Sequence, residues 1–236
     1  MNTNRAKTHG SAGERPRTAG LVRALTPLLA TTFALGWLVR AAWPRPALST
    51  VQVGALCLLL AAALFFLLRF LEKRISSFIK GAHGEEQVAR ELGFLPPDFS
   101  IFHGVDCGGE NDCDHVAVGP NGIFAIETKN WDGRIILQNG RIMYEGQPPD
   151  RDPLQQAARA AESVGQLLEK HLHRTFSVNA VLCFTGSRPE LAAGNYSGVL
   201  VCHRDELNQQ LVATKDSALD KQTRQMIGRL LSDKLD

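Results

Sequence analysis

An uncharged apolar segment near the N-terminus limits most strongly what this chain can fold into. From Ala47 to Leu68 the sequence contains no Asp, Glu, Lys or Arg. A helix needs roughly 20 apolar residues to cross the hydrocarbon core of a bilayer. The segment therefore predicts a transmembrane helix.

A second apolar segment, Leu21–Trp43, precedes it and is uncharged between Ala24 and Val39. Arg23 and Arg40 near its ends can extend toward lipid headgroups, so we expect a second membrane helix here. A cleavable signal peptide is the alternative interpretation. The charged leader before it is long, however, and no small-residue cleavage site precedes the following proline.

The two segments predict a helical hairpin over residues 21–72, because Pro44 and Pro46 favour a tight turn between them. Residues 1–80 hold 11 basic and only 2 acidic side chains. Basic residues favour the cytoplasmic side of a membrane. We therefore expect a multi-pass protein of the cell membrane, with membrane lipid as one partner and both termini and the soluble domain in the cytoplasm. Residues 1–20 are its basic leader and residues 73–80 a basic juxtamembrane linker.

The remainder of the chain has the opposite charge balance, with 15 basic and 22 acidic residues over positions 81–236. Lys and Arg that neutralise phosphates supply most nonspecific affinity for nucleic acid. A broad cationic binding face is therefore excluded, and any contact with nucleic acid must be local. The five cysteines are odd in number and scattered, which indicates reduced thiols and a cytosolic location rather than a disulfide framework.

The first elements after residue 80 are a short helix and a set of strands. GEEQVAREL has helical spacing and is ended by Gly93 and Pro96-Pro97. Apolar runs follow in FSIFHGV, DHVAVG, GIFAIETK and RIILQ, with turn sequences at Pro120-Asn121-Gly122 and Asn139-Gly140. Together they predict a mostly antiparallel meander.

Helices and strands alternate in the rest of the chain. A long helix is expected from Pro153, a residue suited to a first helical turn. VNAVLCFTG and GVLVCH predict buried strands, Asp205 is expected to cap the next helix, and an amphipathic helix follows Ser217. This order predicts an α/β fold in which a mixed sheet is flanked by helices.

Acidic and basic side chains meet at one end of the expected hairpin. Asp114 begins one strand and Glu127-Thr128-Lys129 ends the next. Glu127 and Lys129 share a face, because side chains alternate along a strand. Two carboxylates suit a hard cation such as Mg²⁺. Such an ion lowers the pKa of a bound water, and a nearby lysine orients or activates the nucleophile. The arrangement is typical of phosphodiester hydrolysis. A solvated hairpin edge with loosely paired charges is the structural alternative.

Three blocks of this sequence resemble a known family. GAHGEE, DHVAVGPNGIFAIETKNWDG and DPLQQ are similar to the NERD (nuclease-related) domain of the PD-(D/E)xK nuclease superfamily, from about Gly81 to about Val212. The family more often has Asn-Pro where this chain has Asp152-Pro153. The resemblance implies a restriction-endonuclease-like core and a nuclease-like domain over residues 81–212, which leaves residues 213–236 for the amphipathic helix that the apolar spacing predicts.

The resemblance also implies roles for individual residues. Glu85, Asp114 and Glu127 would be metal ligands, and Lys129 the catalytic lysine. Gln156 would be the helical glutamine, although the adjacent Gln155 leaves that register open.

Two functions follow as hypotheses. The first is a membrane-anchored nuclease that depends on Mg²⁺ or Mn²⁺ and acts on nucleic acid, DNA before RNA. A homo-oligomer would let so small an enzyme cut both strands. The second is a binding or scaffold module with little or no catalytic activity, suggested by the acidic charge of residues 81–236, which slows association with a polyanion.

Other side chains in this region allow a competing metal site. The zinc-binding types His103, Cys107, Cys113 and His115 occur together. Their spacing matches no compact zinc motif, and His115 should face away from its neighbour Asp114. Trp131 either covers the edge of the active site or simply ends a strand.

Overall fold

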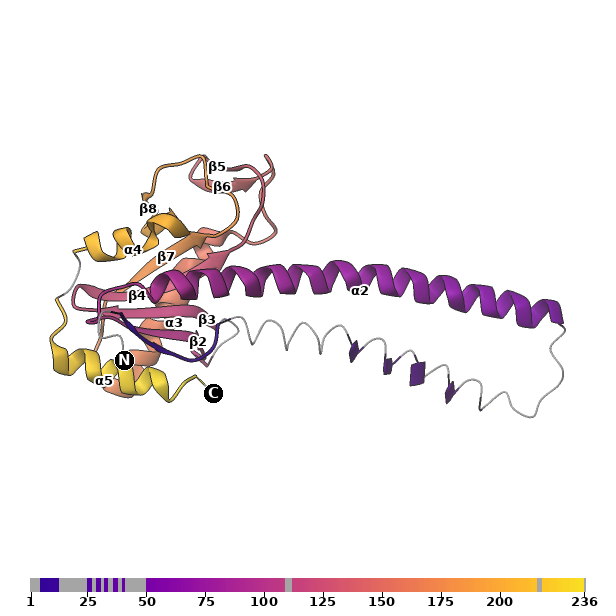
Figure 1. Cartoon of the computed structure of the whole chain (residues 1–236), viewed down its shortest axis with the longest axis horizontal. Coiled ribbons are helices and arrows are strands. Elements are labelled where there is room, and N and C mark those ends of the chain that lie inside the picture. Colours follow the sequence, from indigo (N-terminus) through magenta and orange to yellow (C-terminus); the bar gives the residue numbers. More distant parts are fainter. Residues whose placement is uncertain are drawn as a thin grey trace. The chain divides into compact units, whose positions relative to one another are not determined.

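The computed structural model describes residues 5–12, 25–26, 29–30, 32–33, 36–37, 40, 50–108, 112–215 and 218–235 (Figure 1). The chain divides into two compact units. One comprises Met1–Glu14 with Gly81–Asp236, and the other comprises Arg15–Lys80. Each unit is described by itself below.

The Arg15–Lys80 unit contains the beginning of α2 (Thr50–Leu92), a helix of 43 residues. Several large apolar side chains on its described positions are exposed: Val51, Leu58, Leu59, Phe65 and Phe66. Within the described residues, no helix combines the length and the apolar character that crossing a bilayer demands. The expected span at Leu21–Trp43 falls largely outside the described residues. The two-helix anchor, its lipid partner and its membrane location stay predictions.

The short helix expected at Gly84 is instead the last part of α2, so the prediction of a separate helix is wrong. The helix runs without a break through Gly81 and Gly84 to Leu92. A glycine inside a helix costs only about 1 kcal/mol relative to alanine. This cost is too small to end a helix whose next turns bury Val88 and Leu92 completely.

A seven-stranded mixed sheet forms the centre of the other unit, in the order β1-β2-β3-β4-β7-β9-β8. β2, β3 and β4 are antiparallel neighbours, whereas β4, β7 and β9 run parallel to one another. The strands are β1 (Lys7–His9), β2 (Ser100–Val105), β3 (Cys113–Gly119), β4 (Gly122–Lys129), β7 (Val178–Phe184), β8 (Gly194–Tyr196) and β9 (Val199–His203). The expected α/β class and mixed sheet are confirmed.

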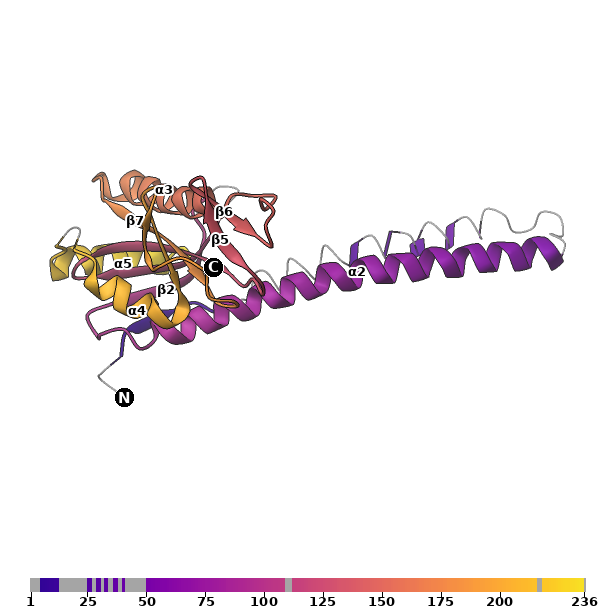
Figure 2. The same ribbon diagram turned by 90° about the horizontal axis from the view of Figure 1, so that it is seen from above.

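Helices cover both faces of this sheet. α3 (Pro153–Leu172) and α5 (Lys221–Ser232) pack on one face, together with Val116, Ala125 and Leu182 of the strands. On the other face pack α4 (Arg204–Ala213) and the last turns of α2. In Figure 2, α3 and α4 lie on opposite sides of the strands. Strands buried on both faces explain the nearly continuous apolar runs of the sequence.

The fourth strand of the expected meander does not join this sheet, which corrects that prediction. β5 (Ile135–Gln138) pairs with β6 (Arg141–Tyr144) in a two-stranded sheet of its own. Parallel β7 occupies the edge of β4 where the meander would have continued. The turn prediction was correct, because Asn139 and Gly140 both have positive φ, 52° and 74°, as a type I′ hairpin turn requires.

The long helix begins as expected, with Asp152 as its cap and Pro153 in its first turn. The Asp152 carboxylate accepts a hydrogen bond from the Leu154 N–H at 2.9 Å. The predicted cap of α4 was wrong: His203 is the cap, and Asp205 lies in the first helical turn. The expected C-terminal helix is α5, capped by Asp220.

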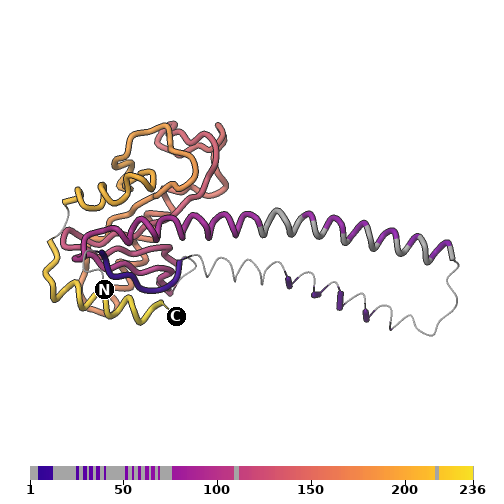
Figure 3. Tube along the Cα trace, viewed as in Figure 1, coloured from indigo at the N-terminus to yellow at the C-terminus, as the bar shows by residue number. Residues whose placement is uncertain are grey.

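A short segment of the basic leader forms the edge strand β1. Lys7–His9 pairs in parallel with β2, and the Ala6 and Lys7 N–H groups donate to the carbonyls of Leu95 and Phe99. Figure 3 shows this N-terminal segment running beside the strands of the sheet. The sequence did not predict it, because three residues are too few to show a periodic pattern.

Two buried histidines lie side by side beneath this edge. The Nδ1 atoms of His103 and His115 are 2.9 Å apart, so one nitrogen must carry a proton and the other must accept it. Burial and the nearby His9 lower the pKa of His103 to about 4. Burial and His103 lower the pKa of His115 well below its usual value. The fold therefore holds both rings neutral.

These shifts predict acid sensitivity. Between about pH 6.5 and pH 4, His103 and His115 bind protons in the unfolded chain but not in the folded protein. The free energy of unfolding therefore falls as the pH falls. Each such proton contributes a slope of about 1.4 kcal/mol per pH unit. Urea unfolding at pH 7, 6 and 5 measures the slope. His115→Asn should reduce it, whereas the exposed His173→Asn should not. Equal slopes in all three proteins would contradict the prediction.

Candidate functional site

The side chains expected to carry chemistry lie where β3 begins and β4 ends. The register pairs His115 with Ile126, so Asp114 stands opposite Glu127 one step further along the two strands. A carboxylate oxygen of Asp114 accepts a hydrogen bond from the Thr128 N–H at 2.8 Å. Backbone pairing and this bond together fix the Asp114 carboxylate at the end of β4.

Three carboxylates act on one another at this point. Loss of water around Asp114 raises its pKa well above the usual value, and the charges of Glu127 and Glu85 raise it further. The Thr128 N–H and the Lys129 ammonium act in the opposite direction. Glu85, Glu127 and Lys129 therefore lie close enough to Asp114 to influence its carboxyl group.

Glu127 and Lys129 project from the same face of β4 and form an ion pair of 2.8 Å. Their side chains are only 14% and 18% exposed, respectively. A solvated hairpin edge would leave such side chains largely open to water, so that alternative does not describe this strand end. The lysine is held in place before any substrate arrives.

Glu85 reaches the site because its neighbour has no side chain. A Cβ atom on Gly84 would lie 2.7 Å from the Cβ of Asn130 and 2.9 Å from the hydroxyl oxygen of Thr185. Such short contacts are not tolerated by packed side chains. Gly84 thus lets α2 approach the ends of β4 and β7, which carries Glu85 toward Asp114.

Gln156 and Lys129 both line a cavity of about 510 Å³. Its neighbour Gln155 is exposed and accepts from Arg159 at 3.5 Å. Of the two glutamines whose register the sequence left open, Gln156 is the one that lines this cavity together with Lys129. Tyr144 and Arg151, which the sequence analysis did not select, also line this cavity. Neither lies in a recognisable motif, so no sequence signal could have found them.

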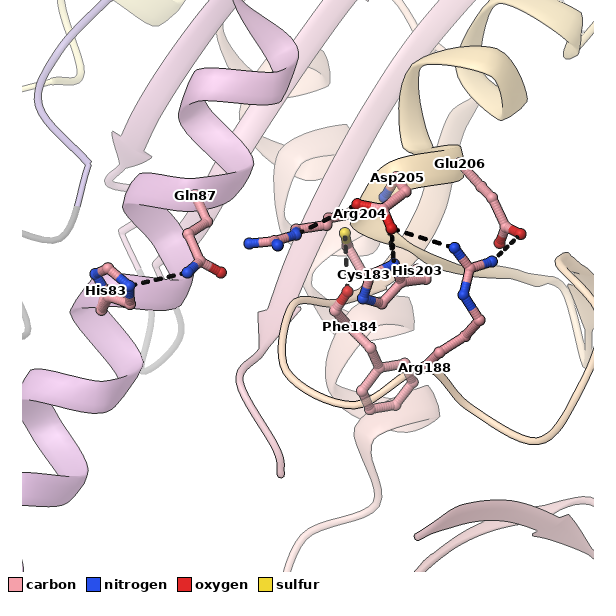
Figure 4. Close-up of polar contacts among 9 residues, drawn as sticks. All are labelled: His83, Gln87, Cys183, Phe184, Arg188, His203, Arg204, Asp205 and Glu206. Atoms are coloured by element: carbon pink, nitrogen blue, oxygen red, sulfur yellow. Dashed lines mark hydrogen bonds and ion pairs between the residues drawn. The ribbon is translucent and has the colours of Figure 1, made fainter. Parts of the chain in front are cut away.

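A second polar cluster, also missed, surrounds the start of α4 (Figure 4). Arg188 forms ion pairs with Asp205 and Glu206, and His203 lies 3.1 Å from the Asp205 carboxylate. On α2, Gln87 and His83 are hydrogen-bonded to each other at 2.9 Å. Because the Arg188 charge is already compensated by two carboxylates, this cluster stabilises the start of α4 and is not an open cationic surface.

The carboxylates do not form a ready-made cage for a metal. Across the described parts of the chain, no group of three or more His, Cys, Asp or Glu side chains could hold an ion. This includes the zinc alternative: His115 pairs with His103, and the Cys113 thiol donates to the His115 carbonyl. Mg²⁺ commonly takes one or two carboxylates and completes its shell with water and phosphate oxygens. Asp114 and Glu127 fit that smaller requirement.

Comparison with known proteins identifies a family over part of the chain. Residues 80–185 match the family described as nuclease-related domain, NERD. The resemblance seen in the sequence is confirmed over this range. The NERD match contains Glu85, Asp114, Glu127 and Lys129 but ends before Val212, to which the sequence motifs extended the resemblance.

A protein of Bacillus anthracis described as uncharacterized is 34% identical over 83 residues, which cover 33% of this chain and 39% of that relative. This chain thus spans well under half of that relative's length. No solved structure matches the chain, so the restriction-endonuclease-like form of the core stays a prediction.

The charges of Glu127 and Glu85 near Asp114 predict that the Asp114 carboxylate lowers the free energy of unfolding when no cation is bound. Asp114→Asn keeps an oxygen for the Thr128 N–H and removes one negative charge. At neutral pH with EDTA the variant should be more stable by roughly 1 kcal/mol, which is about 2–4 °C in a chain of this size. Thermal unfolding measures the difference.

The exposed Asp98→Asn is the matched control and should change nothing. Because the Asp114 pKa is raised, the gain should shrink as the pH falls and the wild-type carboxyl group takes up its proton. A variant no more stable than the wild type would show that the carboxylates do not repel one another.

Proposed function

We propose that this protein is a nuclease that depends on a divalent metal ion and hydrolyses phosphodiester bonds, with DNA favoured over RNA. The observation that carries the proposal is the placement of Asp114 opposite Glu127 at the ends of two neighbouring strands, with Lys129 paired to Glu127 at 2.8 Å. One or two carboxylates are the protein ligands that Mg²⁺ commonly takes. All three residues lie within the NERD match.

Asp114 and Glu127 would hold Mg²⁺ or Mn²⁺, and the negative charge of Glu85 nearby would favour the bound cation. Such an ion, when bound, lowers the pKa of a water molecule and neutralises charge on phosphoryl oxygens. The Thr128 N–H keeps the Asp114 carboxylate oriented throughout, because its bond comes from the backbone of the sheet. The protein thus supplies a rigid pair of oxygen ligands.

Lys129 and Gln156 would act on the substrate itself. The Lys129 ammonium is oriented by Glu127 at 2.8 Å and can donate to a phosphoryl oxygen or to the attacking water. Gln156 lines the same cavity and its amide can donate to a second oxygen. Donors fixed in advance stabilise developing charge without reorganising.

The test is cleavage of DNA and RNA oligonucleotides by the full chain with Mg²⁺, Mn²⁺ or EDTA. Lys129→Ala should lower the cleavage rate at least about 100-fold, as expected for loss of one fixed donor to developing charge. Lys170→Ala, an exposed lysine at the far end of α3, should leave the rate unchanged. Equal cleavage by the wild type and Lys129→Ala would end the catalytic proposal.

The scaffold hypothesis keeps one supporting observation, the excess of acidic residues over positions 81–236. Calorimetric titration with Mg²⁺ separates the two functions. The nuclease should bind Mg²⁺, and Glu127→Gln should weaken that binding. No heat of binding at millimolar Mg²⁺, together with no cleavage, would favour the scaffold.

Anchoring to the cytoplasmic face of a membrane is a further part of the proposal. It is supported by the uncharged run from Ala47 to Leu68 and by the exposed apolar side chains of Leu58, Phe65 and Phe66. Exposed apolar groups of this size are unfavourable in water.

The anchor predicts that most of the full chain stays in the membrane pellet after washing with alkaline carbonate. Phe65→Glu combined with Leu58→Glu should move most of it to the supernatant, because charges inside a bilayer are costly. Recovery of the unaltered chain in the supernatant would disprove the anchor.

A further inference from the structure

The cavity beside Lys129 has features that phosphodiester hydrolysis alone does not require. It measures about 510 Å³, within the usual range for small-molecule sites. Lys129, Gln156 and the loop of residues 147–151 line it. Two aromatic side chains, Trp131 and Tyr144, complete the lining. A phosphate group is recognised by hydrogen-bond donors and cations, and aromatic surfaces contribute nothing to its recognition.

The two aromatic rings are held rigidly. Their centroids are 5.0 Å apart and their planes are tilted by 41°, and Trp131 also rests on the buried Phe184 ring at 5.7 Å. The Tyr144 hydroxyl donates to the Asp132 carbonyl at 2.6 Å. A preformed aromatic surface loses little conformational entropy when a flat ligand stacks on it.

The position of Trp131 depends on a second close backbone approach. A Cβ atom on Gly186 would lie 2.2 Å from the Trp131 carbonyl oxygen. That carbonyl accepts a hydrogen bond from the Ser187 N–H at 2.7 Å. The loop after β7 therefore fixes Trp131 directly beyond the end of β4, two residues from Lys129.

The charges around the cavity favour recognition through a base. Arg151 and Lys129 are the cationic side chains that line it, and Asp150 is acidic. Residues 81–236 as a whole carry more acidic than basic side chains. Affinity for a polynucleotide therefore has to come from something other than many phosphate contacts. Aromatic stacking supplies such affinity to proteins that bind single strands.

We propose that this cavity receives the base of an unpaired nucleotide, which stacks on Trp131 and Tyr144 while the adjoining phosphodiester lies at Lys129. The substrate is then a single-stranded segment or a frayed end rather than a continuous duplex. Bases within a duplex are stacked on each other and must be extruded before they can enter a pocket. This inference rests on the proposed nuclease function and names its substrate class.

The test compares binding of fluorescent oligonucleotides to the full chain by anisotropy, in Ca²⁺ to compensate the carboxylates. Single-stranded DNA, single-stranded RNA of the same sequence and a blunt DNA duplex are the probes. The single strand should bind at least about tenfold more tightly than the duplex, the effect expected from one stacked base. The DNA and RNA arms show which sugar the site accepts.

Variants locate the binding. Trp131→Leu and Tyr144→Leu should each weaken single-strand binding by about tenfold, whereas Trp131→Phe and Tyr144→Phe, which keep a ring, should change it little. Phe94→Leu, at an exposed aromatic residue outside the cavity, is the matched control. Thermal unfolding checks that each variant folds. If the leucine variants misfold, the comparison of single strand with duplex still decides the outcome.

The outcomes for the pocket and for the nuclease are separable. Equal cleavage of blunt duplexes and single strands with Mg²⁺, together with unchanged binding by the leucine variants, would contradict the base-binding pocket. The proposal of a nuclease would still stand. Single-strand binding that depends on Trp131, without cleavage of any probe, would contradict the nuclease proposal. The proposal of a base-binding pocket would still stand.

Discussion

The hydrogen bond from the Thr128 N–H to the Asp114 carboxylate is the interaction on which the site depends. It joins the start of β3 to the end of β4, so the carboxylate stays beside Glu127. The sheet enforces this proximity, because Val116 and Ala125 are completely buried and their pairing fixes the register. A shift by one residue would exchange the side chains that pack against α3 and α5 with those that pack against α2 and α4. Core packing thus stabilises an arrangement of charges that is unfavourable by itself.

Close approaches of backbone at two glycines place the remaining residues. Gly84 allows α2 to reach the strand ends, which brings Glu85 near Asp114, and Gly186 allows the loop after β7 to hold Trp131. Both contacts lie at the carboxyl ends of β4 and β7. Open α/β sheets commonly bind ligands at the carboxyl ends of their parallel strands. The site therefore occupies the position where helix ends, strand ends and a loop can all contribute side chains.

The separate hairpin of β5 and β6 has its own part in this arrangement. Because β7 occupies the free edge of β4, the chain after Lys129 leaves the main sheet and folds back as a two-stranded unit. That unit presents Tyr144 to Trp131. The pairing of β7 with β4 ends the antiparallel meander. It thereby also leads to the separate hairpin that supplies Tyr144 to the cavity.

The sequence by itself determined the elements with strong local signals. Alternating apolar residues gave β2, β3 and β4, Asp152-Pro153 gave the start of α3, and Asn139-Gly140 gave the hairpin turn. Asp114, Glu127 and Lys129 could be selected as a group because a hairpin brings its strand ends together whatever surrounds it. These features depend on residues close in sequence, whose geometry follows from backbone periodicity and turn chemistry.

Only the tertiary structure decided that β7 pairs with β4, that α2 continues without a break to Leu92, and that Gln156 lines the same cavity as Lys129. The parallel pairing of β4 with β7 joins segments separated by the whole of α3, and no local pattern specifies it. β1 and the His103–His115 pair likewise depend on neighbours that the chain brings together only when folded. The cavity is the clearest case. Tyr144 and Arg151 carry no motif, and they line the same cavity as Lys129 only because the core fixes the strands and helices that hold them.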